Sequence, residues 1–313
     1  MRVSMSITHY SWPGGAPRLA AQLTNAVQDA DDGGLDTVWV ADHLIQAEPG
    51  ADPDEAMLEA YTTLGFLAAQ THRVRLGTMV TGVTFRPPAL LVKAVTALDV
   101  LSGGRAWLGV GAGYQQDEAD AMGLPLPPMP ERFQYLEDTL RLAHQMCAGD
   151  HAAFEGQRIR LGRPVNSPRS LQRPHPPILV GGTGERRTLP LVARYADACN
   201  VFDIPDGGAT VRRKLNALAR HCEDIGRPYA EIEKTISTRL MPDETADGFA
   251  NRCRQLAGLG IQHVVVITSG PWNVDGIGLL AAACPLVRGL AEPPVRPEPP
   301  TGPSIPDGSP AGS

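Results

Sequence analysis

The sequence predicts an α/β fold, a (β/α)8 TIM barrel followed by a short tail. Short apolar segments rich in Val, Ile, Leu and Thr alternate with helix-like segments along the chain, which is typical of parallel sheets covered by helices. The chain has 313 residues, of which 42% are hydrophobic, so it can bury one large core. An open, doubly wound sheet is the alternative, because alternation alone does not show that the sheet closes.

Eight segments have the length and composition of buried strands. They are Arg2–Thr8, Asp36–Asp42, Val74–Thr81, Ala106–Gly111, Ile178–Gly182, Asp197–Phe202, Glu233–Leu240 and His263–Thr268.

Helix patterns separate these strands. In the first, Leu19, Leu23 and Ala26 share one face and Gly33–Gly34 provides a stop. Another begins at Pro88 and ends before Gly103–Gly104, with proline at the start and glycine after the end. The others are Met57–Gln70, Arg132–Cys147, Glu185–Tyr195, Gly208–Gly226, Glu244–Leu259 and Val274–Ala283. Strands that each precede a helix favour a closed barrel.

Two regions break this rhythm. Residues 149–177 contain many Pro, Arg and Gly and have no clean periodicity, so we expect an inserted excursion before the fifth strand. The last 22 residues include eight prolines, which predicts a disordered tail. We therefore expect a single (β/α)8 barrel domain over residues 1–290 and a tail over residues 291–313.

Charge and composition exclude several classes of partner. The formal net charge is −6 and the pI is near 5.8, so we expect no binding to nucleic acid or to anionic membranes. The N-terminal residues alternate in polarity and no apolar run is long enough to span a membrane, which predicts a cytoplasmic protein. The five cysteines include no C-x-x-C pair, which predicts buried free thiols.

Polar or glycine-rich residues follow five of the predicted strands. In a barrel of this kind the carboxyl ends of the strands form one rim, where active sites lie. The residues placed there are His9, Asp42–His43, Thr78–Thr81, Gly111–Tyr114 and Gly181–Gly184. Their common position at strand ends predicts a functional site.

Two glycine runs on this rim are candidate ligand loops. Gly181–Gly184 follows a strand and opens a helix, and the free N–H groups at a helix start favour an anion such as phosphate. Gly109–Tyr114 has the same character. A tight turn also requires glycine, so these residues alone leave both interpretations open.

His43 is the candidate catalytic residue, because an imidazole can donate or accept a proton near neutral pH. A structural histidine at a strand end is the alternative. Hydrolases of this fold that use a metal have a His-x-His pair on the first strand, whereas His9 stands alone here, so we expect no metal. The chain also has no G-x-S-x-G motif.

The chain resembles the luciferase-like monooxygenase superfamily, in particular its coenzyme F420-dependent oxidoreductase branch. The resemblance lies in TVWVADHLIQ, RVRLGTMVTGVTFRPPALLVKAVTALDVLSGGRAWLGVGAGY, PERF and HPPILVGGTGERRTLPLVARYADACN, and it covers roughly residues 1–290. It implies an oxidoreductase that transfers a hydride between C5 of the deazaflavin F420 and a small organic substrate. An FMN-dependent monooxygenase is the alternative, since both cofactors share the ring pocket and the phosphate. A non-catalytic cofactor carrier and a metal hydrolase on the same barrel are weaker alternatives. Members of the family often form homodimers, so the resemblance also implies a possible homodimer.

The resemblance also implies roles for individual residues. His43 lies beside the reactive face of the ring, with Asp42 next to it. Met79–Val80 matches a non-proline cis peptide that backs the ring in relatives. The other cofactor-binding positions implied are Thr78, Thr81, Gly111, Ala112, Gly113 and Tyr114 near the ring, and Gly181, Gly182, Thr183 and Gly184 as the phosphate cradle.

The sequence departs from the family at one position and adds one feature. Relatives that act on a sugar phosphate have a catalytic glutamate where this chain has Tyr114, so that activity is not inherited. The excursion contains Arg158, Arg160, Arg163, Arg169 and Arg173, and Arg186–Arg187 follow the phosphate loop. Since F420 carries an acidic oligoglutamate tail, we hypothesise that some of these arginines bind it.

Overall fold

The computed structural model describes residues 1–48 and 50–291, and its central feature is a parallel sheet. The predicted tail lies, from residue 292 on, outside the described residues. The strands are β1 (Arg2–Ile7), β2 (Thr37–Val40), β3 (Arg75–Thr78), β4 (Thr81–Gly82), β5 (Leu108–Gly111), β8 (Ile178–Gly181), β9 (Ala198–Phe202), β10 (Glu233–Arg239) and β11 (His263–Ile267).

The sheet closes into a barrel. Its order is β3-β2-β1-β11-β10-β9-β8-β5-β4, with β3 and β4 at the two ends. These two strands are consecutive pieces of one predicted strand, interrupted at Met79–Val80. Leu76 of β3 also bridges Ala106, just before β5, and Trp107 donates to the Leu76 carbonyl at 2.8 Å. The closed barrel is thus confirmed, and the open doubly wound sheet was the wrong alternative.

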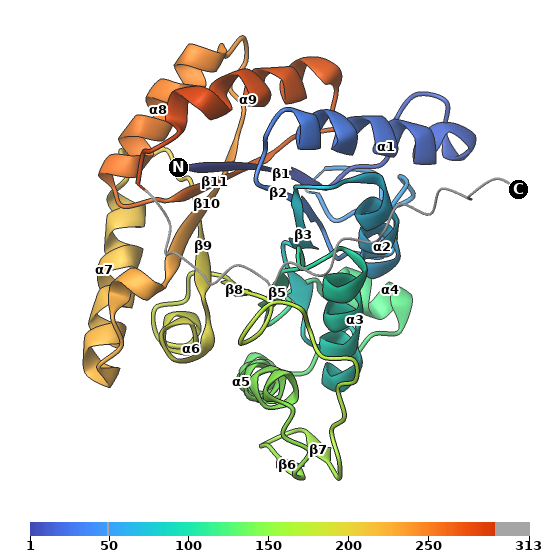
Figure 1. The fold of residues 1–313 in the computed structure, drawn as a ribbon, viewed down its shortest axis with the longest axis vertical. Helices are drawn as coiled ribbons and strands as arrows, with labels where there is room; N and C mark the ends of the chain where they lie inside the picture. Colours follow the sequence, from blue (N-terminus) through green and yellow to red (C-terminus); the bar gives the residue numbers. More distant parts are fainter. Residues whose placement is uncertain (49, 292–313) are drawn as a thin grey trace, which may run out of the picture.

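Helices surround the barrel (Figure 1). They are α1 (Ala16–Asp32), α2 (Ala60–Gln70), α3 (Pro88–Leu101), α4 (Gln116–Met122), α5 (Met129–Ala148), α6 (Thr188–Tyr195), α7 (Ala209–Ile225), α8 (Ala246–Gly258) and α9 (Val274–Val287). Every predicted helix is present with shifted ends. For example, α2 begins at Ala60 and not at Met57, because the Glu59 carboxylate caps it by accepting from the N–H groups of Tyr61 and Thr62.

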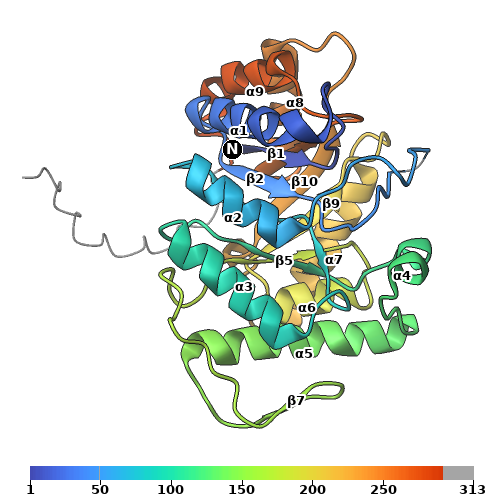
Figure 2. The same ribbon diagram turned by 90° about the vertical axis from the view of Figure 1, so that its right-hand side faces the viewer.

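Three small elements were not predicted, one of them the 3-10 helix Tyr229–Glu231 before β10. Helix α4 has only seven residues and lies between β5 and α5. The excursion contains a short antiparallel hairpin of β6 (Phe154–Glu155) and β7 (Arg160–Leu161). Figures 1 and 2 both place this hairpin on the far side of α5 from the barrel, where the Asp138 carboxylate of α5 accepts from the N–H groups of Arg158 and Ile159.

The interior of the barrel is filled by a separate aromatic and aliphatic cluster. It consists of Trp39, Trp107, Leu179, Ala198 and Val265, with Met79 and Val80 packed against it. These residues come from strands all around the sheet, and such residues can meet only inside a closed barrel. Met79–Val80 therefore lies over the filled interior at the carboxyl end of β3.

A buried hydrogen-bond chain joins β1, β10 and β11 deeper in the barrel. The Ser4 hydroxyl contacts His263 Nε2, and His263 Nδ1 donates to the Glu233 carboxylate at 3.0 Å. Arg2 pairs with the other oxygen of that carboxylate at 3.0 Å. Ser4, His263 and Glu233 are arranged like the side chains of a hydrolytic triad. They are not a candidate active site, since Ser4 and His263 are both fully inaccessible to solvent.

Two further sequence expectations concern the cysteines and membranes. All five cysteines are free thiols, four of them buried and Cys284 half-buried, as the spacing predicted. Within residues 1–48 and 50–291, no helix is both long enough and apolar enough to cross a membrane.

Candidate functional site

The predicted site residues gather at the carboxyl ends of the strands, the end of the barrel that carries α4 in Figure 2. His43 follows β2, and Glu118 comes from α4. His43 Nδ1 donates to the Glu118 carboxylate at 2.7 Å. The second oxygen of Glu118 accepts from the Leu44 N–H at 2.5 Å. Within the described chain no residue bonds His43 Nε2, so that nitrogen is the one available to a ligand.

Glu118 is ionised in this arrangement. Burial alone would raise the pKa of this carboxyl, since its side chain is 1% exposed. The hydrogen bonds from His43 and the N–H groups of Leu44 and Ile45 outweigh burial and lower the pKa below its ordinary value. An ionised acceptor holds the proton of neutral His43 on Nδ1, which leaves Nε2 free to accept a proton.

Asp42 belongs to a different network, although it precedes His43 in the chain. Its buried carboxylate accepts from the Thr81 hydroxyl at 2.7 Å and is paired through both oxygens with Arg86, at 2.5 and 3.0 Å. Arg86 also bonds the Glu59 carboxylate and lies over the ring of Tyr61, 4.8 Å from its centroid. Both oxygens of Asp42 are therefore occupied by protein groups.

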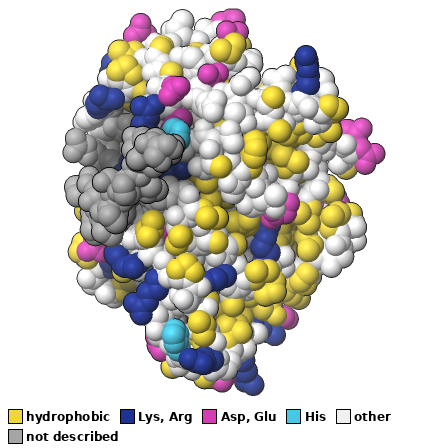
Figure 3. Space-filling view, turned by 45° about the vertical axis from the view of Figure 1, so that its right-hand side comes forward, with side chains coloured by type: hydrophobic (Ala, Val, Ile, Leu, Met, Phe, Trp, Pro, Cys, Tyr) yellow, Lys and Arg dark blue, Asp and Glu magenta, His cyan; other side chains and the backbone are white. Residues whose placement is uncertain are grey.

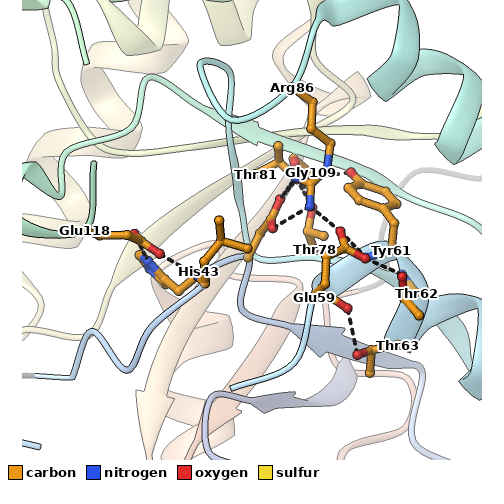
Figure 4. A network of polar contacts seen from close by, with 12 residues as sticks. His43, Glu59, Tyr61, Thr62, Thr63, Thr78, Thr81, Arg86, Gly109 and Glu118 are labelled. Carbon is orange, nitrogen blue, oxygen red and sulfur yellow. Dashed lines mark hydrogen bonds and ion pairs between the residues drawn. The ribbon is translucent and has the colours of Figure 1, made fainter. Parts of the chain in front are cut away.

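Thr78 and Thr81 complete this second network. Their hydroxyls lie 3.0 Å apart, and Thr78 donates to the Gly109 carbonyl at 2.9 Å. The Tyr61 hydroxyl contacts Thr81 at 3.1 Å, and burial raises the pKa of Tyr61 to about 12. Figure 4 shows His43 and Glu118 facing each other on one side, with Arg86, Tyr61, Thr78 and Thr81 clustered on the other.

The Met79–Val80 peptide bond is cis, as the resemblance implied. The side chain of Val80 approaches two of the predicted cofactor-binding glycines. A Cβ atom on Gly111 would lie 2.9 Å from Val80 Cγ2, and one on Gly181 would lie 2.7 Å from it. Both positions need glycine because Val80 packs between β5 and β8. Packing within the protein therefore explains these two glycines without a bound cofactor.

Beyond Gly111 the chain turns outward. Ala112 is half-buried, and Gly113 has φ +75° with its carbonyl accepting from Arg132 of α5. Tyr114 is 70% exposed. Its ring stands edge-on to His43, with 6.1 Å between the ring centroids. An aromatic side chain therefore borders the candidate proton-transfer group.

Gly181–Gly184 joins β8 to the start of α6. Gly182 has φ +103°, which favours glycine. The Gly184 carbonyl accepts from the N–H groups of Arg187, Thr188 and Leu189. Within the described residues, no protein acceptor bonds the N–H groups of residues 183–186. This loop therefore presents free donors at a helix N-terminus, together with the exposed Arg186.

Most of the predicted arginine cluster is not at this loop. Arg158 pairs with Glu131 at 3.2 Å and Arg160 with Glu155 at 3.3 Å. Both lie in or next to the β6–β7 hairpin of the excursion, on the outer side of α5 (Figure 2). Of the predicted arginines, Arg186 and Arg187 are adjacent to the cradle, and Arg187 lies over the ring of Phe133.

Four residues of these networks were missed by sequence reasoning: Tyr61, Glu59, Arg86 and Glu118. Arg86 lies in the quoted string TFRPP, and Glu118 lies four residues after Tyr114. Neither position follows a strand directly, so the rule that led to His43 could not find them. Among residues 1–48 and 50–291, no group of three or more His, Cys, Asp or Glu side chains could hold a metal ion.

Comparison with known proteins places this barrel in a family. Residues 1–263 match the luciferase-like monooxygenase family. The chain belongs to this family. The F420-dependent glucose-6-phosphate dehydrogenase of Kineococcus radiotolerans is 32% identical to this family member over 232 residues, which cover 71% of this chain and 64% of the relative. The chain thus spans slightly less than two-thirds of that relative's length.

Solved structures of other proteins show the same fold. An F420-dependent secondary alcohol dehydrogenase, in complex with an F420–acetone adduct, superimposes with a TM-score of 0.77 at 17% identity, covering 92% of this chain and 99% of that one. An EDTA monooxygenase from a Chelativorans species gives a TM-score of 0.76 at 14% identity, covering 93% and 94%. The same fold thus occurs in an F420-dependent dehydrogenase and in a monooxygenase.

Proposed function

We propose that this protein is a coenzyme F420-dependent oxidoreductase that transfers a hydride between C5 of the deazaflavin and a small organic substrate. The observation that carries the proposal is the joint presence of the His43–Glu118 pair and the free N–H groups of residues 183–186 on one rim. Sequence identity to F420-dependent relatives supports the choice of cofactor.

The residues present fit such a cofactor. The free N–H groups at the start of α6 suit a phosphate, and Met79 and Val80 provide an apolar support over the filled barrel interior. Gly111–Gly113 adds a loop that carries no bulky side chain beside that support. When bound, the deazaflavin supplies or accepts the hydride at its C5.

His43 is the proposed catalytic residue. Its Nδ1 is held by the ionised Glu118, so Nε2 can take a proton from a substrate hydroxyl or, once protonated, return one to a carbonyl oxygen. Asp42, Thr78 and Thr81 are assigned a positioning role, because their polar atoms bond one another, Arg86 and the Gly109 carbonyl. They fix the strand ends on either side of the cis bond.

The substrate proposed is not a sugar phosphate. Tyr114 replaces the expected carboxylate, and Arg239, at the end of β10, is paired with both oxygens of Glu48 at 3.0 Å. Arg86 is paired with two carboxylates as well. Arg239 and Arg86 are thus committed to internal ion pairs, which favours an uncharged substrate.

The test is a titration of cofactor-free protein with F420 and with FMN. We expect F420 to bind and FMN to bind at least about tenfold more weakly. Gly182→Ala, which places a side chain at φ +103° in the cradle, should weaken F420 binding. Gly226→Ala, at the positive-φ C-cap of α7 with open space around it, is the matched control. Tight FMN binding without F420 binding would replace this proposal by the monooxygenase alternative.

The role of His43 has its own test. His43→Asn should reduce hydride transfer by about 10²- to 10⁴-fold, the usual contribution of general acid–base catalysis, with F420 affinity retained. His72→Asn is the control, since His72 is an exposed histidine. Unchanged turnover in His43→Asn would remove His43 from the mechanism and leave it a ring-positioning residue at most.

We also infer that the protein forms a homodimer through α2 and α3, two neighbouring helices. Helix α2 contains no charged residue, and Phe66, Leu90 and Leu101 on these helices are exposed. Figure 3 shows hydrophobic side chains gathering on this side of the molecule. A cytoplasmic location and a single domain over residues 1–290 complete the proposal.

A further inference from the structure

The carboxyl end of β1 contains a buried histidine nitrogen that no protein group bonds within residues 1–48 and 50–291. His9 lies two residues beyond β1, and its side chain is 5% exposed. Within the described residues, no atom bonds its Nε2, and the neighbouring Thr8 Oγ1 also lacks a partner. Buried polar atoms in folded proteins are nearly always hydrogen-bonded, so an unsatisfied pair at one strand end points to a ligand.

The surroundings of His9 decide which nitrogen carries the proton. The Gln46 carbonyl oxygen accepts from the N–H groups of Ala47 and Glu48, at 2.9 and 3.0 Å. The orientation of this amide is therefore fixed, and its NH2 group must face the other way. That group donates to the Thr8 carbonyl at 3.2 Å and to His9 Nδ1 at 3.1 Å.

Because His9 Nδ1 accepts a hydrogen bond, it carries no proton in the neutral ring, and the proton is on Nε2. Nε2–H is thus a donor, and its missing partner is an acceptor. Burial of an anion there would need a cation, yet Arg239 and Arg86 are already paired with carboxylates. The acceptor that fits is the oxygen of an uncharged group, a carbonyl or a hydroxyl.

This donor lies next to the proposed reaction site. Strands β1 and β2 are paired in parallel, with Ile7 opposite Val40, and the Ala41 N–H donates to the Ile7 carbonyl at 3.0 Å. His9 and Asp42–His43 therefore leave the barrel on adjacent strand ends. Gln46, in the loop that follows His43, contacts His9 directly.

We propose that His9 Nε2–H forms a substrate subsite that binds a neutral carbonyl or hydroxyl oxygen. This inference rests on the proposed function, in which such a group reacts beside His43. It identifies the substrate class as ketones, aldehydes or alcohols without a charged group near the reacting centre. His9 is a positioning residue in this scheme, with the proton transferred by His43.

The experiment uses the full-length protein loaded with oxidised F420 and labelled with ¹⁵N-histidine. The probes are cyclohexanone and methylenecyclohexane, which have similar shape but differ in the oxygen acceptor. We expect the His9 imidazole to show the Nε2–H tautomer, and its Nε2–H signal to shift with cyclohexanone and not with the hydrocarbon. The signal is assigned by its loss in His9→Gln.

Affinity provides the second measurement. His9→Phe should weaken cyclohexanone binding by about 3- to 10-fold, the effect of one neutral hydrogen bond, and leave hydrocarbon binding unchanged. His151→Phe, at an exposed histidine, is the matched control. A signal that no oxygen-bearing probe moves would mean that Nε2 binds a structural water only and would overturn the inference.

Failure of the proposed function gives a different result. If F420 did not bind, the cofactor titration would show it, and cyclohexanone could still be titrated into the cofactor-free protein. The NMR measurement on the unchanged protein also decides the case if His9→Phe does not fold. A His9 ring protonated on Nδ1 would contradict the tautomer argument directly.

Discussion

At the scale of single residues, the His43–Glu118 contact determines what the histidine can do. Glu118→Gln keeps an acceptor for the Leu44 N–H and removes the charge that holds His43 Nδ1. We expect kcat to fall by about 10- to 100-fold, part of the general acid–base contribution, while F420 affinity stays within about threefold. Asp117→Asn, on the same turn of α4, is the control. Equal kcat in Glu118→Gln and wild type would show that Glu118 does not position His43.

The sequence predicted some of the site residues and missed others, and the difference has a physical reason. His43 was found because strand ends define the rim of a barrel. Glu118 was not, because α4 is a seven-residue helix whose placement depends on tertiary packing. Gly111 and Gly181 were predicted as cofactor-binding, and their packing against Val80 gives them a structural reason for being glycine. Contacts between distant segments cannot be seen in local patterns.

At the scale of elements, the interrupted third strand depends on Gly109 of β5. A Cβ atom there would lie 1.9 Å from the Thr78 carbonyl oxygen, a backbone atom that cannot rotate away. We expect Gly109→Ala to lower the free energy of unfolding by about 3 kcal/mol or more, at the upper end for overpacking. Gly278→Ala, in an exposed turn of α9 with open space, should raise it by about 0.5–1 kcal/mol. Urea unfolding measures both, and equal effects would contradict the packing argument.

The elements themselves were largely predictable, because apolar periodicity reports burial on one face. The ends were less so, since caps decide them, as Glu59 does for α2. The third strand was predicted as one segment, Val74–Thr81, and the structure divides it into β3 and β4. Its composition is that of a continuous strand, so only the resemblance to the family indicated the interruption.

The connection from α2 to β3 depends on a carboxylate from α1. Asp31 accepts from the N–H groups of His72, Arg73 and Val74, at 2.8, 2.9 and 2.7 Å. Burial would raise the pKa of Asp31, but these three donors outweigh it and lower the pKa. Asp31→Asn should therefore cost about 1–3 kcal/mol of unfolding free energy at pH 7. Asp32→Asn, at a neighbour whose side chain is 88% exposed, should cost less than about 0.5 kcal/mol.

The difference in unfolding free energy between wild type and Asp31→Asn depends on pH. Its direction follows from the lowered pKa of Asp31 in the folded state. A lowered pKa in the folded state means that the stabilisation is complete above the ordinary aspartate pKa of about 3.9 and is lost as the pH falls through the lower folded value. The stabilities of wild type and Asp31→Asn should therefore converge below about pH 4. A difference that stayed constant down to pH 3 would show that the charge of Asp31 is not involved.

At the scale of the whole molecule, the sequence predicted a closed barrel with one functional rim but gave no indication of which outer face is covered. The exposed apolar residues of α2 and α3 suggest that a second copy covers this face, because burial of about 800 Å² on each partner is enough for a stable dimer. Phe66→Glu and Leu90→Glu place charges on the face, and sedimentation should show a shift from dimer to monomer. Val274→Glu, at an exposed position on α9, should remain dimeric. A wild-type protein that sediments as a monomer at all concentrations would refute the dimer, and the proposed F420 site, built from one chain, would be unaffected.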